Sequence, residues 1–393
     1  MHETELTYER LGVSSHKRDV HDAISDLDQG LFPGAFCKAI PDVLSGSLDH
    51  CLLVHADGAG TKSTVAYLHY LQHRNPSIFA GIAQDSAVMN LDDLLCVGAT
   101  GPFAVANTIG RNKKLIPGEV VRAIIHGYEE FFARMEPYGV RLYSCGGETA
   151  DLGDLVQTLM VDSTFTTRMR RDEFINCANA MPGHALVGLA SFGHASYETA
   201  PNSGIGTNGF TAARHRLLSR VYRRYAETYA PQIVDDAYTG QHTLDTPLPG
   251  TPMSLGEALL SPTRTYAPIL VAILRTYRPG ISAVFHNSGG GLTKCLNFAQ
   301  RVTYIKDDLF PPPPIFDFLR TEGSFTWSEM VQTFNMGHRL EIACDPAISN
   351  DIIALAREYN VDGRVIGRIV PRERGPALII TCANERLEFT APN

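Results

Sequence analysis

Short apolar runs that end in glycine or polar residues alternate with longer amphipathic stretches along the chain. Apolar runs of about four to eight residues bounded by turn residues indicate strands, whereas longer segments with a helical apolar repeat indicate helices. The alternation predicts a mixed α and β protein. Strands are expected at 51–56, 103–109, 140–145, 156–167, 185–191, 281–286 and 339–345, and helices at 14–27, 62–72, 85–98, 117–138, 208–229, 263–276 and 346–359.

The periodicity is lost over 170–184, and a new strand pattern begins at Ala185. At 393 residues the chain is long enough for two domains that each bury a core. We therefore expect an N-terminal domain, 1–178, and a C-terminal domain, 179–393, with the boundary near residue 178.

Composition narrows the class of protein. Hydrophobic residues make up 44% and charged residues 19%, and no stretch reaches the roughly 18 to 20 apolar residues of a membrane helix. The net charge of −8 argues against a broad nucleic-acid surface. The eight cysteines are scattered without a CxxC pair, which indicates reduced thiols and no structural zinc. The first residues carry no signal-like apolar run, so a cytoplasmic protein without membrane or nucleic-acid partners is expected.

A glycine-rich segment, Asp57–Lys62 (DGAGTK), directly follows the first predicted strand. Glycines let backbone amides approach a phosphate, and the start of a helix favours anionic oxygens. Lys62 could add a positive charge, although Thr61 stands where a P-loop requires glycine. The alternative is a tight strand-to-helix turn in which Asp57 caps the helix.

Several carboxylates in the first half of the chain are candidate Mg²⁺ ligands. Magnesium prefers hard oxygen ligands, and carboxylates from separate loops can hold it on a nucleoside triphosphate. Each acid could instead be a cap or a surface charge. The candidates are Asp85, Asp92, Asp93, Glu148 and Asp151, of which the last two belong to a second predicted glycine turn, Gly146–Asp151 (GGETAD).

Two more glycine-rich segments lie in the second half. His286–Gly291 (HNSGGG) ends a predicted strand, and its three consecutive glycines indicate close approach by a ligand or by another backbone segment. His286 either handles a proton or a phosphate, or is a structural donor at the strand end. Gly204–Phe210 (GIGTNGF) is either an anion-binding helix start or a loop capped by Asn208.

Taken in order, these segments resemble the aminoimidazole ribonucleotide synthetase (phosphoribosylformylglycinamidine cyclo-ligase) family over nearly the whole chain. The order of the motifs makes joint chance occurrence implausible. The family patterns Y-x-x-x-G-V, D-G-x-G-T-K, G-G-E-T-A, L-L-x-P-T-R, H-x-[ST]-G-G-G and T-F-N-x-G match Tyr8–Val13, Asp57–Lys62, Gly146–Ala150, Leu259–Arg264, His286–Gly291 and Thr333–Gly337.

The resemblance implies an α+β fold of two domains, in which N-terminal domains pair their strands into a barrel across a homodimer and the C-terminal domain is α/β. It implies ATP-dependent cyclisation of formylglycinamidine ribonucleotide to aminoimidazole ribonucleotide, with release of ADP and phosphate, in purine biosynthesis. Mg²⁺ would accompany ATP, and a requirement for K⁺ stays open.

The resemblance also assigns roles to individual residues. It makes Asp57, Asp85 and Glu148 the Mg-ATP carboxylates, and it makes Lys62 and His286 catalytic. The nucleotide would further contact Gly58, Gly60, Thr61, Lys62, Gly146 and Gly147, and the substrate would contact His286, Ser288, Gly289, Gly290, Gly291, Asn208 and Asn335.

Several departures from the family pattern indicate a divergent branch. The usual G-P-H-S-N-G-Y is Gly204–Phe210 here, so Gly206 replaces a histidine whose role is either lost or moved, with His194 and His215 as candidates. The loop before it, Ser196–Ser203, looks inserted. The usual M-x-x-N-D-L has aspartate at Asp92, and the N-terminal nucleotide loop is reduced to 31–36.

Other functions remain in competition. Selenophosphate synthetase needs a reactive cysteine in a glycine-rich N-terminal segment, for which Cys37 is a loose candidate, and a small-molecule kinase of the same superfamily is a further alternative. A hydrogenase-maturation protein would need a C-terminal cysteine tail, whereas this chain ends in LEFTAPN. A non-catalytic nucleotide-binding homologue is the alternative from another class.

Overall fold

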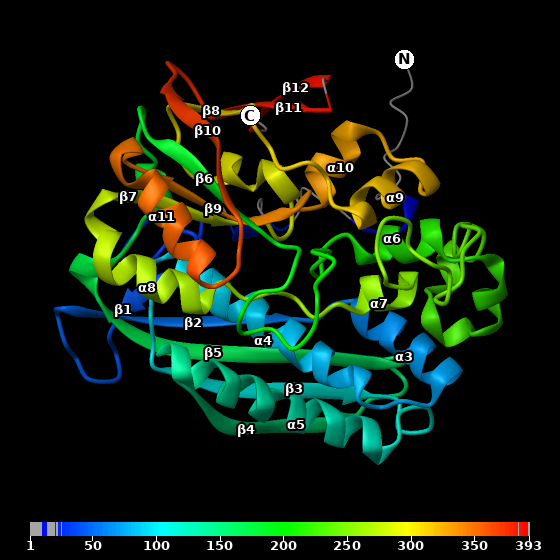
Figure 1. The fold of residues 1–393 in the computed structure, drawn as a ribbon. Coiled ribbons are helices and arrows are strands. Elements are labelled where there is room, and N and C mark those ends of the chain that lie inside the picture. Colours follow the sequence, from blue (N-terminus) through cyan, green and yellow to red (C-terminus); the bar gives the residue numbers. More distant parts are fainter. Residues whose placement is uncertain (1–9, 14–19, 21–22, 25, 384, 392–393) are drawn as a thin grey trace.

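Two β-sheets with helices between and around them organise the computed structural model, which describes residues 10–13, 20, 23–24, 26–383 and 385–391 (Figure 1). The first sheet has the order β1-β2-β5-β3-β4, and all its neighbours are antiparallel except the parallel pair β3 and β4. Its strands are β1 (Ala39–Pro41), β2 (His50–Gly58), β3 (Phe103–Arg111), β4 (Leu142–Asp151) and β5 (Leu159–Arg170).

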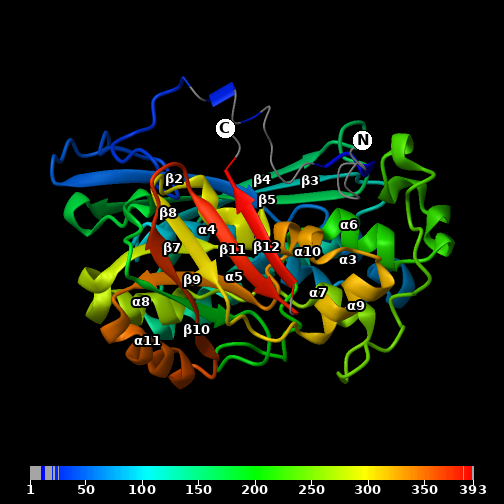
Figure 2. The same cartoon turned by 90° about the horizontal axis from the view of Figure 1, so that it is seen from above.

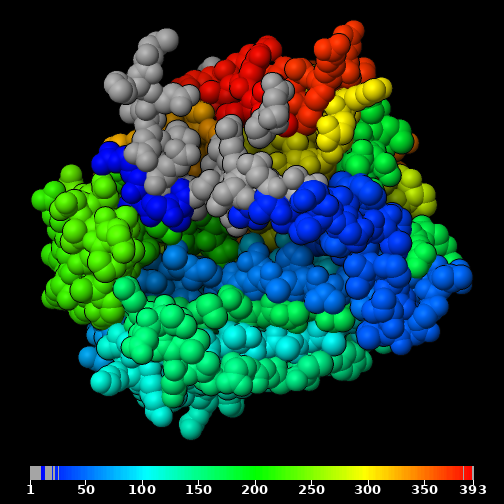
Figure 3. Space-filling model, turned by 180° about the vertical axis from the view of Figure 1, so that it is seen from behind, coloured from blue at the N-terminus to red at the C-terminus, as the bar shows by residue number. Residues whose placement is uncertain are grey.

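Helices cover one face of this sheet and leave the other face bare. Strand β5 alternates between buried and partly exposed residues from Leu159 to Thr166, as expected of a strand with one covered face. Figure 3 shows the bare face as neighbouring stripes of β2, β5, β3 and β4. The covering helices are α3 (Lys62–His73), α4 (Ile78–Cys96) and α5 (Gly118–Met135).

Helix α4 is the centre of the molecule. It packs on β2 and β5 of the first sheet and also on β7 and α8 of the second half, so it lies between the two sheets (Figures 1 and 2). Leu91, Leu94 and Leu95 are completely buried, and each contributes about 1.5–3 kcal/mol through the hydrophobic effect. The helix also buries polar residues, among them Asp85, Asp92 and Asp93, and buried charges of this kind need partners.

The second sheet is mixed and has the order β12-β11-β8-β10-β6-β9-β7. Its strands are β6 (Ala185–Ala190), β7 (Ile281–His286), β8 (Val302–Lys306), β9 (His338–Cys344), β10 (Gly363–Pro371), β11 (Ala377–Cys382) and β12 (Glu385–Thr390). The helices of this half are α6 (Phe210–Leu217), α7 (Leu255–Leu260), α8 (Ala267–Tyr277), α9 (Pro314–Glu322), α10 (Trp327–Thr333) and α11 (Pro346–Glu358). Short 3₁₀ segments lie at 136–138, 171–173, 177–179, 220–224, 226–228, 231–233, 278–280 and 291–297.

The mixed α and β architecture predicted from the sequence is confirmed, with displaced ends. The helix predicted at 85–98 begins earlier, at Ile78, and the one predicted at 208–229 is α-helical only from Phe210 to Leu217. The helix predicted at 14–27 lies mostly outside the described residues. The sequence pattern does not predict strands β1, β8, β10, β11 and β12 or helices α7, α9 and α10.

The glycine turn predicted at Gly146–Asp151 is wrong, because these residues continue strand β4. The pairing with β3 shifts between Val105 and Asn107, where β4 has one extra residue, and Gly146 adopts φ +79 at this bulge. A left-handed glycine is a common way to absorb the extra residue of a bulge. Among the described residues, no helix is long and apolar enough to cross a membrane.

Candidate active site

The first glycine-rich segment connects strand β2 to helix α3. Gly60 adopts φ +56, a left-handed conformation that glycine takes without strain, and the Ala59 amide donates to the Val161 carbonyl at 2.9 Å. Thr61 precedes the helix without forming a side-chain cap, and its Oγ1 lies 3.1 Å from Thr211 Oγ1. The first-turn amides of a helix have no intrahelical partner, so this turn can present N–H groups to an anion.

A hollow of about 470 Å³ opens beside this turn, with two carboxylates at its edge. Asp57 does not cap helix α3, because its Oδ1 accepts from the adjacent Gly58 amide at 2.7 Å. Asp162 lies on β5 between Gly58 of β2 and Thr108 of β3. A side chain at position 58 would overlap the Asp162 carboxylate, so the site needs glycine there. The lining is completed by Ala56, Gly60, Ser163 and Thr164.

The two carboxylates at the hollow are electrostatically unfavourable neighbours. Asp57 keeps an exposed edge, yet the surrounding protein removes enough water to raise the pKa of its carboxyl, and the nearby Asp93 charge raises it further. Burial raises the pKa of Asp162, and the charge of Asp57 adds to this effect. A cation between the two carboxylates would relieve this repulsion. This donor set suits Mg²⁺, which takes one or two carboxylates and fills its other positions with water and phosphate oxygens.

The three acids predicted as one metal-binding set are not brought together. Glu148 lies in the same cross-strand row as Gly58 but three strand spacings away, about 14 Å. Asp85 is completely buried within α4 and does not come from a loop. Gly146 and Gly147 shape the bulge of β4. The described part of the chain contains no group of three or more His, Cys, Asp or Glu residues placed to hold a metal ion.

Lys62 is buried and bonded to both halves of the chain. Its Nζ donates to Asp85 Oδ1 at 2.9 Å, to the Gly206 carbonyl at 3.2 Å and to the Ser261 carbonyl at 2.6 Å. Asp85 Oδ1 also accepts from the Thr263 amide at 2.8 Å. Burial lowers the pKa of Lys62, and the negative charge of Asp85 partly offsets this shift. The predicted role of Lys62 as a cation of the phosphate loop does not fit this conformation, because all three contacts would have to be released.

His286 lies at the end of β7 and pairs with Asp93 of α4. The distance from His286 Nδ1 to Asp93 Oδ1 is 2.5 Å, and Asp93 Oδ2 lies 3.4 Å from His55 Nε2. Burial alone would raise the pKa of Asp93, but the charges of His286 and His55 outweigh it and lower the pKa. His286 Nε2 is buried and has no hydrogen-bond partner. The pair therefore joins a carboxylate of the first half to an imidazole with one unused nitrogen.

This pair is connected to the glycine turn. His55 Nδ1 lies 2.9 Å from Asn90 Oδ1, and Asn90 Nδ2 donates to the Asp57 carbonyl at 3.0 Å and to Ser163 Oγ at 3.1 Å. A chain of polar contacts thus runs from His286 through Asp93, His55 and Asn90 to the backbone of Asp57, with an ion-pair distance between Asp93 and His55 and hydrogen bonds at the other steps. These contacts connect His286 to the glycine turn.

The three glycines after His286 have different surroundings. A Cβ on Gly291 would lie 2.6 Å from the Val331 carbonyl, so this glycine permits the predicted close approach of another backbone segment. Gly290 adopts φ +92. Gly289 is exposed, and the nearest group to its Cβ position is the Asn208 side chain, at 3.8 Å. Ser288 is buried. Asn208 therefore lies beside the HNSGGG loop at Gly289, and the role of both in substrate binding stays a prediction.

Asn335 has a structural role that the sequence does not reveal. Its Nδ2 donates to the carbonyls of Gly204 and Ile205, at 2.9 and 3.2 Å, and its Oδ1 accepts from Ser191 Oγ at 3.0 Å and from the Gly337 amide at 2.9 Å. All of its polar positions serve protein partners. Asn335 therefore holds the 204–209 loop and does not point a free group at the substrate.

Neither histidine suggested as a replacement stands at the position of Gly206. His194 is exposed and its Nε2 lies 3.0 Å from the Glu198 carbonyl. His215 is buried in α6, where its Nδ1 accepts from the Tyr238 amide at 3.2 Å, and burial lowers its pKa to about 2. The side chain that borders Gly206 is Arg339.

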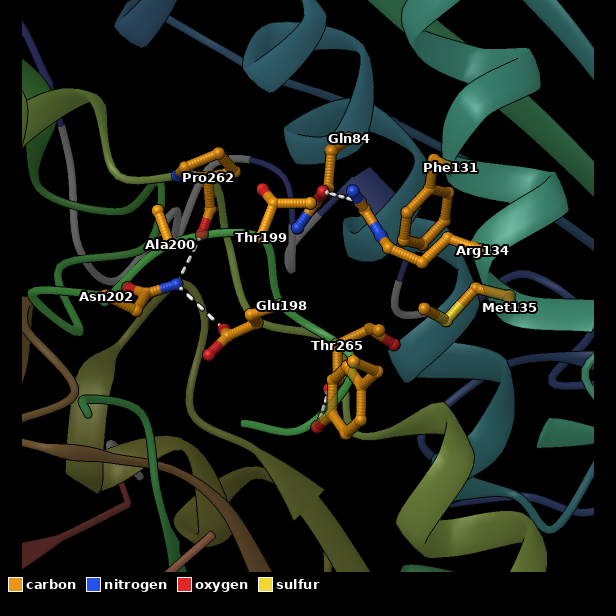
Figure 4. Close-up of a pocket in the computed structure, with 11 residues that line it drawn as sticks. Gln84, Phe131, Arg134, Met135, Glu198, Thr199, Ala200, Asn202, Pro262 and Thr265 are labelled. Atoms are coloured by element: carbon orange, nitrogen blue, oxygen red, sulfur yellow. Dashed lines mark hydrogen bonds between the residues drawn. The ribbon is translucent and has the colours of Figure 1, made fainter. Parts of the chain in front are cut away.

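The loop that looks inserted, Ser196–Ser203, packs against the segment 259–265, which belongs to the same half of the chain. Arg264 forms a buried ion pair with Glu198 at 2.5 Å, and Asn202 Nδ2 donates to Glu198 Oε1 and to the Pro262 carbonyl (Figure 4). Arg134 of α5 closes the other side through a bond to Gln84. The cavity they enclose has a volume of about 30 Å³, enough for a water molecule but not for a nucleotide.

The sequence pattern overlooks two residues near the site. Asp162 sits in a strand and belongs to no glycine motif, so the only sequence signal is an acid among the apolar and Thr positions of β5. Arg339 was counted as part of a predicted strand. Its nearness to the site becomes visible only in the folded structure, where its side chain lies beside Gly206 of the 204–209 loop.

Two family models match the chain. One is the AIR synthase related protein, N-terminal domain, over residues 41–169. The other is the AIR synthase related protein, C-terminal domain, over residues 181–379.

Curated relatives match over most of their length. The chain is 28% identical over 324 residues to a protein of Methanocaldococcus jannaschii, covering 82% of this chain and 79% of the relative. It is 29% identical over 333 residues to one of Staphylococcus carnosus, covering 84% and 82%, and 29% identical over 418 positions to one of Nitrosococcus oceani, covering 99% of each. All three carry the name phosphoribosylformylglycinamidine cyclo-ligase.

Solved structures share the fold. The chain superimposes on Thermotoga maritima PurL complexed with FGAR with a TM-score of 0.57 and 14% identity, covering 98% of this chain and 52% of PurL. It therefore spans about half the length of that protein. A crystal structure of a Thermus thermophilus protein gives a TM-score of 0.54 and 16% identity, covering 92% of this chain and 96% of that one.

Proposed function

We propose, from the premise that this chain belongs to the AIR synthase related protein family, that it is an ATP-dependent phosphoribosylformylglycinamidine cyclo-ligase of purine biosynthesis. It cyclises formylglycinamidine ribonucleotide to aminoimidazole ribonucleotide and releases ADP and phosphate. The observation that carries this proposal is the shared name of relatives that align over 79–99% of their own length. The same fold binds FGAR in PurL and is also known with ADP, which supports a nucleotide and a ribonucleotide as ligands.

Asp57 and Asp162, with the turn at the start of α3, are the groups we assign to Mg-ATP. The support is geometric and electrostatic, since two mutually repelling carboxylates and a helix start border one hollow of about 470 Å³. Bound Mg²⁺ would neutralise charge on the phosphates during phosphoryl transfer. The amides of Gly60 and Thr61 would orient the phosphate oxygens, since those of Gly58 and Ala59 already donate to Asp57 and Val161.

His286 is the group we assign to proton transfer. In this family's reaction ATP phosphorylates the amide oxygen of the substrate, and a nitrogen of the same molecule then displaces the phosphate and loses a proton. Asp93 accepts a hydrogen bond from Nδ1 of His286, which leaves Nε2 as the atom that can take that proton. The unused buried Nε2 is the support for this assignment.

The bare face of the first sheet is the surface we assign to a homodimer. Val54 of β2 and Tyr143 of β4 are 52% and 55% exposed on this sheet, and sheet faces with apolar side chains are normally covered. A barrel formed with the strands of a second copy would cover it. We place the domain boundary near residue 178, between the last strand of the first sheet and the first strand of the second. Cytoplasm is the compartment we assign, because the eight cysteines are unpaired.

The test is ADP release by the purified protein with Mg-ATP, with and without formylglycinamidine ribonucleotide, together with detection of the aminoimidazole product. We expect ADP and product in equal amounts, and only when the substrate is present. ATP binding without product would contradict the cyclo-ligase assignment and point to a different substrate or to a non-catalytic homologue.

A further inference from the structure

Arg339 is a buried cation with unused hydrogen-bond donors. Its side chain is only 2% exposed, and its Nη2 donates to the Arg264 carbonyl at 3.3 Å. The Nε and Nη1 atoms have no partner. Arg264, which is equally buried, differs, because its Nε, Nη1 and Nη2 all donate to Glu198 or to backbone carbonyls. Buried guanidinium donors are normally paired, so the free donors of Arg339 need an explanation.

The charge of Arg339 is balanced by an ion pair that includes no hydrogen bond. The nearest carboxylate is Asp92, at 3.7 Å from Nη2, which is too long for a hydrogen bond. Asp85 and Asp93 already pair with Lys62 and His286, at 2.9 and 2.5 Å. Asp92 balances the charge of Arg339 but leaves Nε and Nη1 without an acceptor, and a phosphate oxygen is an acceptor that suits these donors.

Arg339 contacts both glycine-rich loops of the second half, one through its guanidinium and the other through its backbone. Its Nη1 would be 3.0 Å from a Cβ on Gly206. The guanidinium therefore lies next to the position at which the family pattern has a histidine side chain. The backbone carbonyl of Arg339 accepts from the Asn287 amide at 2.7 Å, which fixes the residue to the start of the HNSGGG loop. Asn208 and Gly289, on the two loops, face each other nearby.

We propose that Arg339 is a substrate-binding residue whose Nε and Nη1 donate to a phosphate oxygen of the substrate. For the phosphate to reach these donors, the contacts of Asn335 and Lys62 with the carbonyls of residues 204–206 would have to be released. Arginine suits this role because its guanidinium stays charged and presents several donors to one phosphate. The inference rests on the proposed cyclo-ligase function for the identity of the substrate, but not for the binding of phosphate.

The test compares wild type with Arg339→Met and Arg339→Lys. Arg339→Met removes the charge while keeping an apolar stem, but it leaves the buried Asp92 without its cation, so this variant is expected to be less stable than wild type. Arg339→Lys keeps the charge without the fork of donors. The matched control is Arg368→Met. Arg368 is an exposed arginine of β10 that pairs with Asp307. Circular dichroism checks the fold of each variant.

The first readout is thermal stabilisation by inorganic phosphate, which needs no turnover. We expect saturable stabilisation of wild type and of Arg368→Met, and a loss of apparent phosphate affinity of about tenfold to a hundredfold in Arg339→Met. Arg339→Lys should fall between them. No stabilisation of wild type, or equal stabilisation of wild type and Arg339→Met, would overturn the proposal.

The second readout is steady-state kinetics. A rise of about tenfold or more in KM for formylglycinamidine ribonucleotide, with KM for ATP unchanged, would place the substrate's own phosphate on Arg339. A fall in kcat with both KM values unchanged would place the transferred phosphoryl group there. If wild type makes no aminoimidazole product but Arg339→Met still loses phosphate binding, the cyclo-ligase proposal fails and the anion site stands. Unchanged kinetics in Arg339→Met would contradict a substrate contact.

Discussion

Asp162 illustrates how one residue can enter a site through strand pairing alone. Its neighbours in the cross-strand row are Gly58 and Thr108, and glycine at 58 leaves room for its carboxylate beside Asp57. At the residue scale, the candidate metal site is thus a pair of acids on adjacent strands. The sequence reveals only one of them, because Asp57 belongs to a glycine motif and Asp162 does not.

Asp162→Asn should separate the metal role from a structural one. Without Mg²⁺ we expect a melting temperature no lower than that of wild type, because the variant removes one of two mutually repelling charges. Stabilisation by Mg-ATP, measured by differential scanning fluorimetry, should be strongly reduced. Asp57→Asn should behave alike, whereas Asp154→Asn, in an exposed turn, should match wild type. If Mg-ATP stabilised Asp162→Asn and Asp57→Asn as strongly as wild type, the two carboxylates would not be metal ligands.

The buried His215 should make the stability of the folded protein depend on pH. Burial lowers its pKa in the folded protein to about 2, while the unfolded chain has a value of about 6.5. Between these values the unfolded state binds the extra proton, so stability is fully present above pH 6.5 and falls as the pH falls, by about 1.4 kcal/mol per unit.

His215→Asn should flatten this slope, since asparagine can still accept from the Tyr238 amide but takes up no proton. Urea unfolding at pH 7.5, 6 and 5 measures the slope. The exposed His194→Asn should leave it unchanged. Equal slopes in wild type and His215→Asn would mean that His215 is protonated in the folded protein.

Strand β4 shows that two glycines of one motif can be required for different structural reasons. Gly146 takes the left-handed conformation of a bulge, while a Cβ on Gly147 would collide with the Asn107 carbonyl of β3. At the scale of the element, GGETAD is therefore a paired strand with a bulge. Its resemblance to a loop motif misled the sequence prediction because glycine is common in both contexts.

Gly147→Ala should destabilise the protein by about 1–3 kcal/mol, because a methyl group would push β4 away from β3. Chemical denaturation measures the free energy of unfolding. Gly118→Ala is the control, since a Cβ at the start of α5 meets nothing within 4 Å and alanine favours helix. A Gly147→Ala protein as stable as Gly118→Ala would show that the β3–β4 pairing is different.

Buried ion pairs join the two halves at the scale of the whole molecule. Lys62 and Asp85 come from the first half and bind Gly206, Ser261 and Thr263 of the second, and His286 binds Asp93 of α4. These contacts fix the position of the 204–209 loop and the HNSGGG loop relative to the turn at Asp57. Stability and site geometry therefore depend on the same contacts.

Lys62→Met should cost about 3–5 kcal/mol in unfolding free energy, because Asp85 would remain buried without its cation. Adding Asp85→Asn should cost less than the sum of the single changes, by about 1 kcal/mol or more. Lys113→Met, which breaks an exposed pair with Asp151, should cost less than about 1 kcal/mol. Additive single and double variants of Lys62 and Asp85 would indicate that the pair is not coupled in solution.

Most of the architecture was accessible from the pattern of apolar residues. Strands β2, β3, β5, β6, β7 and β9 and the main helices follow local periodicity, and the glycine motifs mark the turn before α3 and the loop after β7. Helices α7, α9 and α10 were missed, as were strands β1, β8 and β10 to β12. Their apolar runs are short or interrupted by charge, and their identity depends on the neighbours with which they pair.

The sequence by itself determined the family, the order of the motifs and the chemistry available to them, because local pattern and residue type persist in any conformation. Only the tertiary structure decided which side chains each motif residue contacts. Asp85 and Lys62 neutralise each other in the interior, Asn335 holds a loop, and Asp162 and Arg339 reach the site through strand pairing. Burial and pairing are properties of residues distant in sequence, so no local pattern contains them.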